Sequence, residues 1–310
     1  MARFNVHILG CGSALPNLKH NTSSQLVEIH DKIFMVDCGE GTQLQLRKSK
    51  VHFAKVAAIF ISHLHGDHCF GLMGLASTFG LLGRTAPLHI YAPKEMQELF
   101  DLQKRIFCST FEYELVFHPV DTTQSNVIYE DKSLTVVTVP LKHRVPCCGF
   151  LFKEKAGLPH INREMTDYYG VPQSQYNNIK TGCDWINGDG ERIPWQKLTM
   201  PAQKPLSYAY CSDTKYIPTL HNMIGNVDAL YHESTYTEAD AKQAAKYNHS
   251  TARQAAMVAK AANAGMLMLG HYSSKYGNEQ CILEEAKSVF ENAWLTNETD
   301  VFDIEKQQKL

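Results

Sequence analysis

The chain has 310 residues and a formal net charge of −2 at pH 7. The length suits one large domain or two modest ones. The absence of a basic excess weakens any nucleic-acid-binding hypothesis, although a local basic patch is compatible with overall neutrality. No apolar stretch reaches the roughly 18–20 residues of a membrane span, and the N-terminal residues lack the layout of a signal peptide, so we expect a cytoplasmic protein without a membrane segment.

Strands and helices are predicted in a mixed order. Runs rich in Val, Ile, Phe and Tyr and bounded by Gly, Asp or Pro predict strands, and runs between some of them predict helices. In chain order, we expect strands at 4–10, 23–30, 32–37, 56–62, 87–92, 134–141, 206–212, 227–233 and 265–271, and helices at 39–49, 70–83, 93–106, 238–247 and 251–264. Thr251 and Gln254 form a capping box at the start of the last helix. The order predicts an α/β protein in which helices sandwich the sheets.

The segment 151–205 differs from the rest of the chain. It holds five of the twelve prolines and shows no steady periodicity. Loops of this length are rare unless they are functional, so we interpret it as an inserted arm. Its seven basic and six acidic residues nearly cancel, and its composition alone does not indicate an RNA-binding surface. Its aromatic residues can stack on RNA or form a small core, and we favour the core for most of them: Tyr168, Tyr169, Tyr176, Trp185 and Trp195.

The nine cysteines are odd in number, irregularly spaced and without a CxxC pair. This pattern does not fit an ordinary structural zinc site. We therefore expect most of them to be small buried thiols in a reducing compartment.

A dense group of metal-ligand residues follows the fourth predicted strand. The stretch FISHLHGDHCFG contains His63, His65, Asp67 and His68. An extended chain puts residues two apart on the same side, so His63 and His65 can face one metal ion. The chain can turn at the following glycine, after which Asp67 and His68 can face a neighbouring point. One segment can thus supply ligands to two ions.

Other predicted strands also end in ligand-type residues. LTVVTVPLKH ends in His143, LSYAYCSD in Asp213 and GMLMLGH in His271. Functional side chains from several strand ends often meet at one edge of a scaffold. A single His at a strand end is more often a polar cap, but the HxHxDH stretch favours the ligand interpretation here.

These residues predict a site for two metal ions. Two roughly tetrahedral ions need about eight ligand contacts, some of them from shared water. Nitrogen and oxygen ligands without thiolate suit Zn²⁺, with Mn²⁺ as the alternative. We assign His63, His65 and His143 to one ion, Asp67, His68 and His271 to the other, and Asp213 to both. Four histidines lack this context and are interpreted as structural: His89, His118, His160 and His221.

HxHxDH followed by His, Asp and His resembles the metallo-β-lactamase superfamily over nearly the whole chain. Within it, five stretches resemble motifs of the ribonuclease Z family, the tRNA 3′-processing endonucleases: LGCGSALP, DCGEGTQLQL, SDT, HESTY and NHSTA. The resemblance implies a single αββα sandwich domain over residues 1–310. It implies that the inserted arm, 151–205, is an exosite for tRNA. It also implies a homodimer that acts on precursor tRNA.

The resemblance further implies a zinc-dependent endoribonuclease that removes the 3′ trailer. Two ions share a hydroxide that attacks phosphorus, and Asp67 orients the water or accepts its proton. His249 protonates the departing ribose 3′-oxygen, and Glu233 orients His249 or shares its proton. The products are a tRNA 3′-hydroxyl and a trailer 5′-phosphate. Without the resemblance, the residues fit a structural role as well as a catalytic one. In the structural role, His249 is a loop residue and Glu233 is a buried salt-bridge partner.

Two other functions remain open from the sequence. One is a metallo-hydrolase of small phosphodiesters or thioesters on the same fold. The other is a non-catalytic RNA-binding protein, against which the complete ligand set argues. Removal of the arm tests the first alternative, because RNA cleavage should then collapse while a small phosphodiester is still hydrolysed. The metal content of the chain tests the second, because about two ions per chain support catalysis and none favours a non-catalytic protein.

Overall fold

The computed structural model of the chain describes residues 4–15, 17–107 and 111–310. They form two compact units, one made of residues 131–135 and 153–205 and the other of the remaining described residues. Across these described ranges, no helix combines the length and the apolar character that a bilayer crossing requires.

The first sheet of the larger unit has eight strands. They run across it in the order β19 (Gln308–Lys309), β18 (Val301–Asp303), β1 (Phe4–Gly10), β2 (Ser24–Ile29), β3 (Lys32–Val36), β4 (Val56–Phe60), β5 (Leu88–Ala92) and β6 (Leu115–Pro119). From β19 to β3 neighbours pair antiparallel, and from β3 to β6 they pair parallel. The carboxyl ends of β3 and β4 therefore lie at the same edge of the sheet.

The second sheet has seven strands. Their order is β17 (Ala293–Leu295), β16 (Met266–Gly270), β15 (Ala229–Glu233), β14 (Ser207–Cys211), β9 (Cys148–Glu154), β8 (Leu134–Pro140) and β7 (Val127–Glu130). Strands β14 to β17 are parallel. The carboxyl ends of β14, β15 and β16 are therefore neighbours, as are the residues that follow them.

Large aromatic side chains fill the space between the two sheets. The ring of Phe34 on β3 lies 6.0 Å from that of Phe152 on β9, and Phe60 on β4 lies 5.4 Å from Phe150. All four side chains are fully buried. Burying each contributes about 1.5–3 kcal/mol, so the sheets are held face to face by apolar contact.

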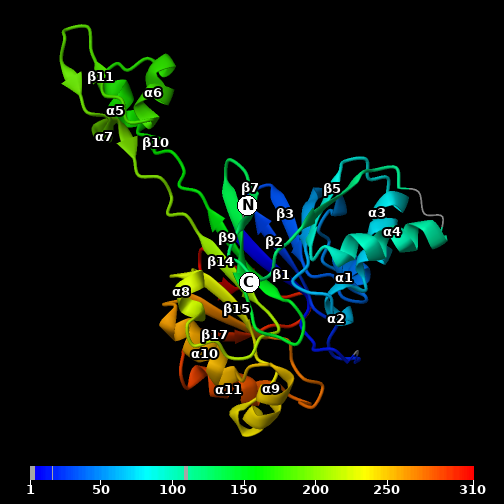
Figure 1. The fold of residues 1–310 in the computed structure, drawn as a ribbon. Coiled ribbons are helices and arrows are strands. Elements are labelled where there is room, and N and C mark those ends of the chain that lie inside the picture. The colour runs from blue at the N-terminus through cyan, green and yellow to red at the C-terminus, as the bar shows by residue number, and fades with distance from the viewer. Residues whose placement is uncertain (1–3, 16, 108–110) are drawn as a thin grey trace. The chain divides into compact units, whose positions relative to one another are not determined.

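Helices cover the outer faces of both sheets, which gives the αββα order (Figure 1). On the first sheet lie α1 (Thr42–Lys48), α3 (Leu72–Leu81) and α4 (Glu95–Phe107), and on the second α8 (Leu220–Ile224), α10 (Ala252–Ala261) and α11 (Gln280–Lys287). The shorter elements are α2 (Gly66–Cys69), α9 (Ala241–Tyr247), η1 (Phe53–Lys55) and η3 (Glu238–Asp240). The capping box at Thr251 and Gln254 is confirmed. The predicted sandwich is confirmed as well.

The smaller unit has a core of its own. Its elements are β10 (His160–Ile161), α5 (Arg163–Tyr168), η2 (Gln173–Gln175), α6 (Tyr176–Lys180), β11 (Trp185–Ile186), β12 (Arg192–Ile193), α7 (Trp195–Leu198) and β13 (Thr199–Met200). Val171, Ile179, Ile193 and Leu198 are buried together. Tyr169, Tyr176, Trp185 and Trp195 pack against them, as the core interpretation predicts. Tyr168 does not, and 79% of it is exposed.

All of the strands expected from the sequence are present, but several others were not predicted. Both faces of strand β9 are covered. Its sequence is therefore a nearly continuous apolar run and lacks the polar–apolar alternation by which a half-buried strand is recognised. Strands β17, β18 and β19 have only two or three residues each. Such short strands depend on their neighbours in the sheet, so the local sequence carries little signal for them.

Candidate metal centre

The structure brings all of the predicted metal-ligand residues together at one edge of the sandwich. His63, His65, Asp67 and His68 follow β4 of the first sheet, while the other three follow strands of the second sheet: His143 after β8, Asp213 after β14 and His271 after β16. Because β14 pairs parallel with β15, and β15 with β16, the segments that follow β14 and β16 emerge at the same edge of the second sheet.

The first cluster contains three histidines and a carboxylate. The Nδ1 of His65 lies 3.1 Å from the Nε2 of His63 and 3.2 Å from the Nε2 of His143. The Oδ2 of Asp213 lies 3.6 Å from the His63 nitrogen and 3.5 Å from the His143 nitrogen. These atoms surround one point at the separations expected for ligands of a single ion.

The second cluster uses the other oxygen of the same carboxylate. The Oδ1 of Asp213 lies 3.2 Å from the Nε2 of His68 and 3.0 Å from the Nε2 of His271. The Oδ2 of Asp67 lies 3.5 Å from the first nitrogen and 3.4 Å from the second. Asp213 thus faces both clusters, with one oxygen toward each.

Two buried nitrogens show that these residues fit a metal. Within the described part of the chain, the Nε2 atoms of His68 and His271 have no hydrogen-bond partner although both side chains are buried. Burying a polar atom without a partner costs free energy. The nearest charged neighbours of these two nitrogens are the carboxylate oxygens of Asp213 and Asp67. Atoms in this arrangement are suited to coordinate a common cation.

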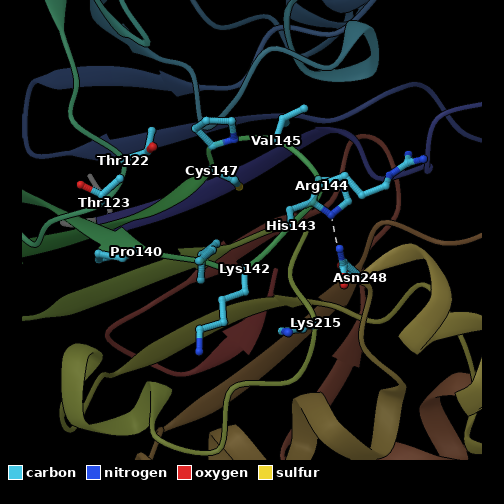
Figure 2. Close-up of a pocket in the computed structure, with 12 residues that line it drawn as sticks. Thr122, Thr123, Pro140, Lys142, His143, Arg144, Val145, Cys147, Lys215 and Asn248 are labelled. Carbon is cyan, nitrogen blue, oxygen red and sulfur yellow. Dashed lines mark hydrogen bonds between the residues drawn. The ribbon is translucent and has the colours of Figure 1, made fainter.

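The opposite ring nitrogens are held by protein groups. The Nδ1 of His143 donates to the backbone oxygen of Asn248 at 3.1 Å (Figure 2). That of His271 lies 3.0 Å from the Oγ1 of Thr235. Such contacts fix the orientation of an imidazole and leave its other nitrogen for a metal.

Asp37 performs the same task for His68, and the sequence analysis missed this residue. Its Oδ2 lies 2.7 Å from the Nδ1 of His68 and accepts hydrogen bonds from Tyr210 at 2.7 Å and Ser62 at 2.9 Å. Asp37 directly follows β3 and is fully buried. The rule that located Asp213, a carboxylate at the end of an apolar strand, would also have found it.

Two residues at this edge adopt left-handed backbone conformations. Asp37 has φ 57° and His271 has φ 60°. Non-glycine residues adopt this region at a cost, and they do so mainly where the surrounding structure requires it. In both cases the residue turns sharply out of a strand, which aims its side chain across the edge.

In the second cluster, the carboxylates and imidazoles stabilise each other's charged forms. Burial raises the pKa of Asp67, but the His68 and His271 imidazoles outweigh it and hold that pKa well below its usual range. Burial also lowers the pKa of His271, while Asp213 and Asp67 raise it to about 10. The carboxylates therefore stay ionised and attract positive charge to this point.

Glu233 and His249, the predicted catalytic pair, are in contact. The Oε1 of Glu233 lies 2.8 Å from the Nδ1 of His249. The same oxygen accepts from the backbone N–H of Thr214 at 2.8 Å, and Oε2 accepts from Thr235 at 2.6 Å. Asn248 ends α9 in the left-handed conformation and so directs His249 toward Asp213 and His271, with ligand atoms within 4.8 Å of one another.

Comparisons with known proteins identify similar chains. Residues 4–159 match the family model described as Anti-Pycsar protein Apyc1. Ribonuclease Z of Bacteroides fragilis is 52% identical over 298 residues, which cover 96% of this chain and 98% of that protein. Ribonuclease Z of Phocaeicola vulgatus is 49% identical over 305 residues, which cover 98% of this chain and 99% of that protein.

Solved structures show the same fold at lower identity. The short form of human tRNase Z (ELAC1) aligns with a TM-score of 0.71 and 24% identity over 97% of this chain and 99% of that one. The Bacillus subtilis protein YhfI, described as having the metallo-β-lactamase fold, aligns with a TM-score of 0.67 and 20% identity over 96% and 98%. The sandwich described above is therefore a metallo-β-lactamase fold.

Proposed function

Because the chain belongs to the ribonuclease Z family, we propose that it removes the 3′ trailer from precursor tRNA. As a member of that family it is a metal-dependent endoribonuclease. Residues 4–159 also fall in the family described as Anti-Pycsar protein Apyc1. The observation that carries the proposal is the pair of ligand clusters that share Asp213.

We propose that the centre holds two Zn²⁺ ions, with Mn²⁺ as the alternative. His63, His65 and His143 would bind one ion, Asp67, His68 and His271 the other, and Asp213 both. The nitrogen and oxygen donor set and the partnerless Nε2 atoms of His68 and His271 support this assignment. When bound, such ions supply positive charge against a phosphate and lower the pKa of water toward neutrality.

The residues around the centre account for the proton transfers of hydrolysis. Asp67 orients the attacking water or accepts its proton as the new O–P bond forms. The bond between phosphorus and the ribose 3′-oxygen breaks, and His249 gives that oxygen a proton. Burial lowers the pKa of His249, but Glu233 outweighs it and raises that pKa, which favours the protonated imidazole that this step uses. A tRNA 3′-hydroxyl and a trailer 5′-phosphate result.

The arm is proposed to bind tRNA as an exosite. It has its own apolar core, and several polar and aromatic groups stay exposed on it, among them Arg163, Tyr168 and Lys197. Exposed aromatic rings and cations are the groups that contact RNA bases and phosphates. The resemblance of the sequence to the family, which implies an exosite at this insertion, supports the proposal.

A homodimer in the cytoplasm completes the proposal. Helices α1, α3 and α4 expose large apolar side chains, including Leu44 at 61%, Leu81 at 86% and Ile106 at 59%. Exposed apolar residues of this size are typical of protein interfaces. The described cysteines are all free, and six of them are buried, which suits a reducing compartment. Sedimentation equilibrium of the purified chain tests the dimer.

The first experiment is cleavage of a labelled precursor tRNA that carries a 3′ trailer, with the cut position mapped. We expect one cut at the 3′ end of the tRNA body, which chelation abolishes and added Zn²⁺ restores. Asp67→Ala should lose this cut while its circular dichroism spectrum stays that of the parent. If the parent leaves the precursor intact but hydrolyses bis(p-nitrophenyl) phosphate, the chain is instead a hydrolase of small phosphodiesters.

A further inference from the structure

A groove of about 580 Å³ opens directly beside the metal-ligand residue His143. Its walls include Lys142 and Arg144 on either side of that histidine in the chain, together with Lys215 and Asn248. Figure 2 shows Lys142 and Lys215 on one side of the imidazole and Arg144 on the other. The volume lies in the range of about 300–1,000 Å³ that is typical of ligand sites.

Backbone hydrogen bonds tie the two lysines to the metal-ligand segments. The N–H of Lys215 donates to the backbone oxygen of Lys142 at 2.9 Å. The N–H of Lys142 donates to the Oγ1 of Thr214 at 3.2 Å, and Thr214 directly follows the shared ligand Asp213. Both lysines therefore have a fixed place relative to the centre.

The three cations of the groove are available to a ligand. Lys142, Arg144 and Lys215 are exposed. Throughout residues 4–15, 17–107 and 111–310, no carboxylate forms an ion pair with any of them. The guanidinium of Arg144 lies 6.0 Å from the centre of the Tyr247 ring, which supports it without neutralising its charge. This local excess of positive charge contrasts with the net charge of −2 for the chain.

Cations without partners beside a hydrolytic centre fit a phosphate chain better than a neutral ligand. We propose that this groove binds the RNA phosphates that flank the scissile bond, with Lys142 and Lys215 on one side of His143 and Arg144 on the other. The proposal rests on the proposed function and adds a binding site to it. The phosphates belong either to the trailer or to the 3′ end of the tRNA body.

The test measures kcat/KM for precursor tRNA at several KCl concentrations. The variants are Lys142→Ala/Lys215→Ala, its charge-preserving counterpart Lys142→Arg/Lys215→Arg, and Arg144→Ala. Lys287→Ala, in the exposed last turn of α11, is the matched control. Each phosphate contact to single-stranded RNA contributes about 0.7 to the slope of log affinity against log salt. The double alanine variant should thus lose about 1.4 of this slope and at least tenfold in kcat/KM at low salt.

Precursors with a one-nucleotide and a ten-nucleotide trailer distinguish the two sources of phosphate. A loss that grows with trailer length assigns the groove to the trailer, whereas an equal loss on both assigns it to the tRNA body. The arginine variant should keep the parental slope. The proposal fails if the alanine variants keep the slope of Lys287→Ala, or if bis(p-nitrophenyl) phosphate hydrolysis falls as much as RNA cleavage. If the parent does not cleave precursor tRNA, the proposed function fails instead.

Discussion

The imidazole Nδ1 of His249 lies 2.8 Å from the carboxylate Oε1 of Glu233, and both side chains are almost fully buried. A buried carboxylate in this position stabilises the protonated imidazole and fixes its orientation. The backbone N–H of Thr214 and the hydroxyl of Thr235 hold the carboxylate in turn. The pair is therefore held in one orientation by buried contacts, as the proposed role of His249 as a proton donor requires.

Replacing His249 should expose this role through the leaving group. We expect His249→Ala to lower kcat for precursor tRNA by about 10²–10⁴-fold, the usual contribution of general acid catalysis. Hydrolysis of bis(p-nitrophenyl) phosphate should fall far less, because p-nitrophenolate departs without a proton. The measurement is kcat on both substrates, with metal content determined for each preparation. Equal losses would show that His249 supports the metal centre instead.

Asp37 should control metal affinity. Asp37→Asn weakens the contact that orients His68, and loss of such an outer carboxylate typically costs about 10–100-fold in metal affinity. Zn²⁺ affinity measured by competition with a chromophoric chelator tests this. Asp101→Asn, an exposed change on α4, is the matched control. Unchanged affinity in the Asp37 variant contradicts the orienting role.

Removing the arm should separate RNA cleavage from the chemistry itself. Replacing residues 158–202 with a short Gly-Ser linker deletes the apolar core that centres on Ile179 and leaves every metal-ligand residue in place. We expect cleavage of precursor tRNA to fall by at least 100-fold, mainly through KM, while the small phosphodiester is still hydrolysed. Retention of full RNA cleavage would exclude the exosite.

His20 should give a pH-dependent contribution to stability. Its Nδ1 lies 3.0 Å from Glu298 and its Nε2 lies 3.3 Å from Glu279. Burial lowers the pKa of His20, but these carboxylates outweigh it and raise that pKa. The pKa of an unfolded histidine is about 6.5. The ion pairs therefore contribute their full stabilisation of the folded state below that pH, and this contribution is lost as the pH rises through the raised pKa of His20 in the folded protein.

Urea unfolding at pH 6 and pH 9 measures this contribution. His20→Gln should lower the free energy of unfolding by about 1–3 kcal/mol at pH 6, as expected when a buried charged partner is removed. The difference from the parent should be smaller at pH 9. His160→Gln, an exposed change, is the control. A difference that is equal at both pH values means that His20 is not charged in the folded protein.

The grouping of the proposed ligand residues could be predicted because their chemistry is local and unusual. His63, His65, Asp67 and His68 lie within one short stretch, and each remaining ligand follows an apolar strand. Strand ends that meet at one edge of the sandwich bring such residues together.

The contacts that orient these ligands could not be predicted in the same way. Asp37 meets Tyr210 across the interior, although the two residues lie far apart in the chain and on different sheets. His143 is held by a backbone oxygen, that of Asn248, which no side-chain pattern reveals. The grouping of Lys142 with Lys215 likewise follows from how two loops pair.

The proposed centre takes ligands from both sheets, and this has a consequence for folding kinetics. His63 and His271 are separated by 271 − 63 = 208 positions along the chain, so the complete ligand set forms only after distant segments have met, a slow process. Bound ions would then act as cross-links between the sheets. Any opening that parts the sheets must break metal–ligand bonds, which slows unfolding more than it speeds folding. With the proposed ions bound, the lifetime of the folded protein would depend on how fast those ions are released.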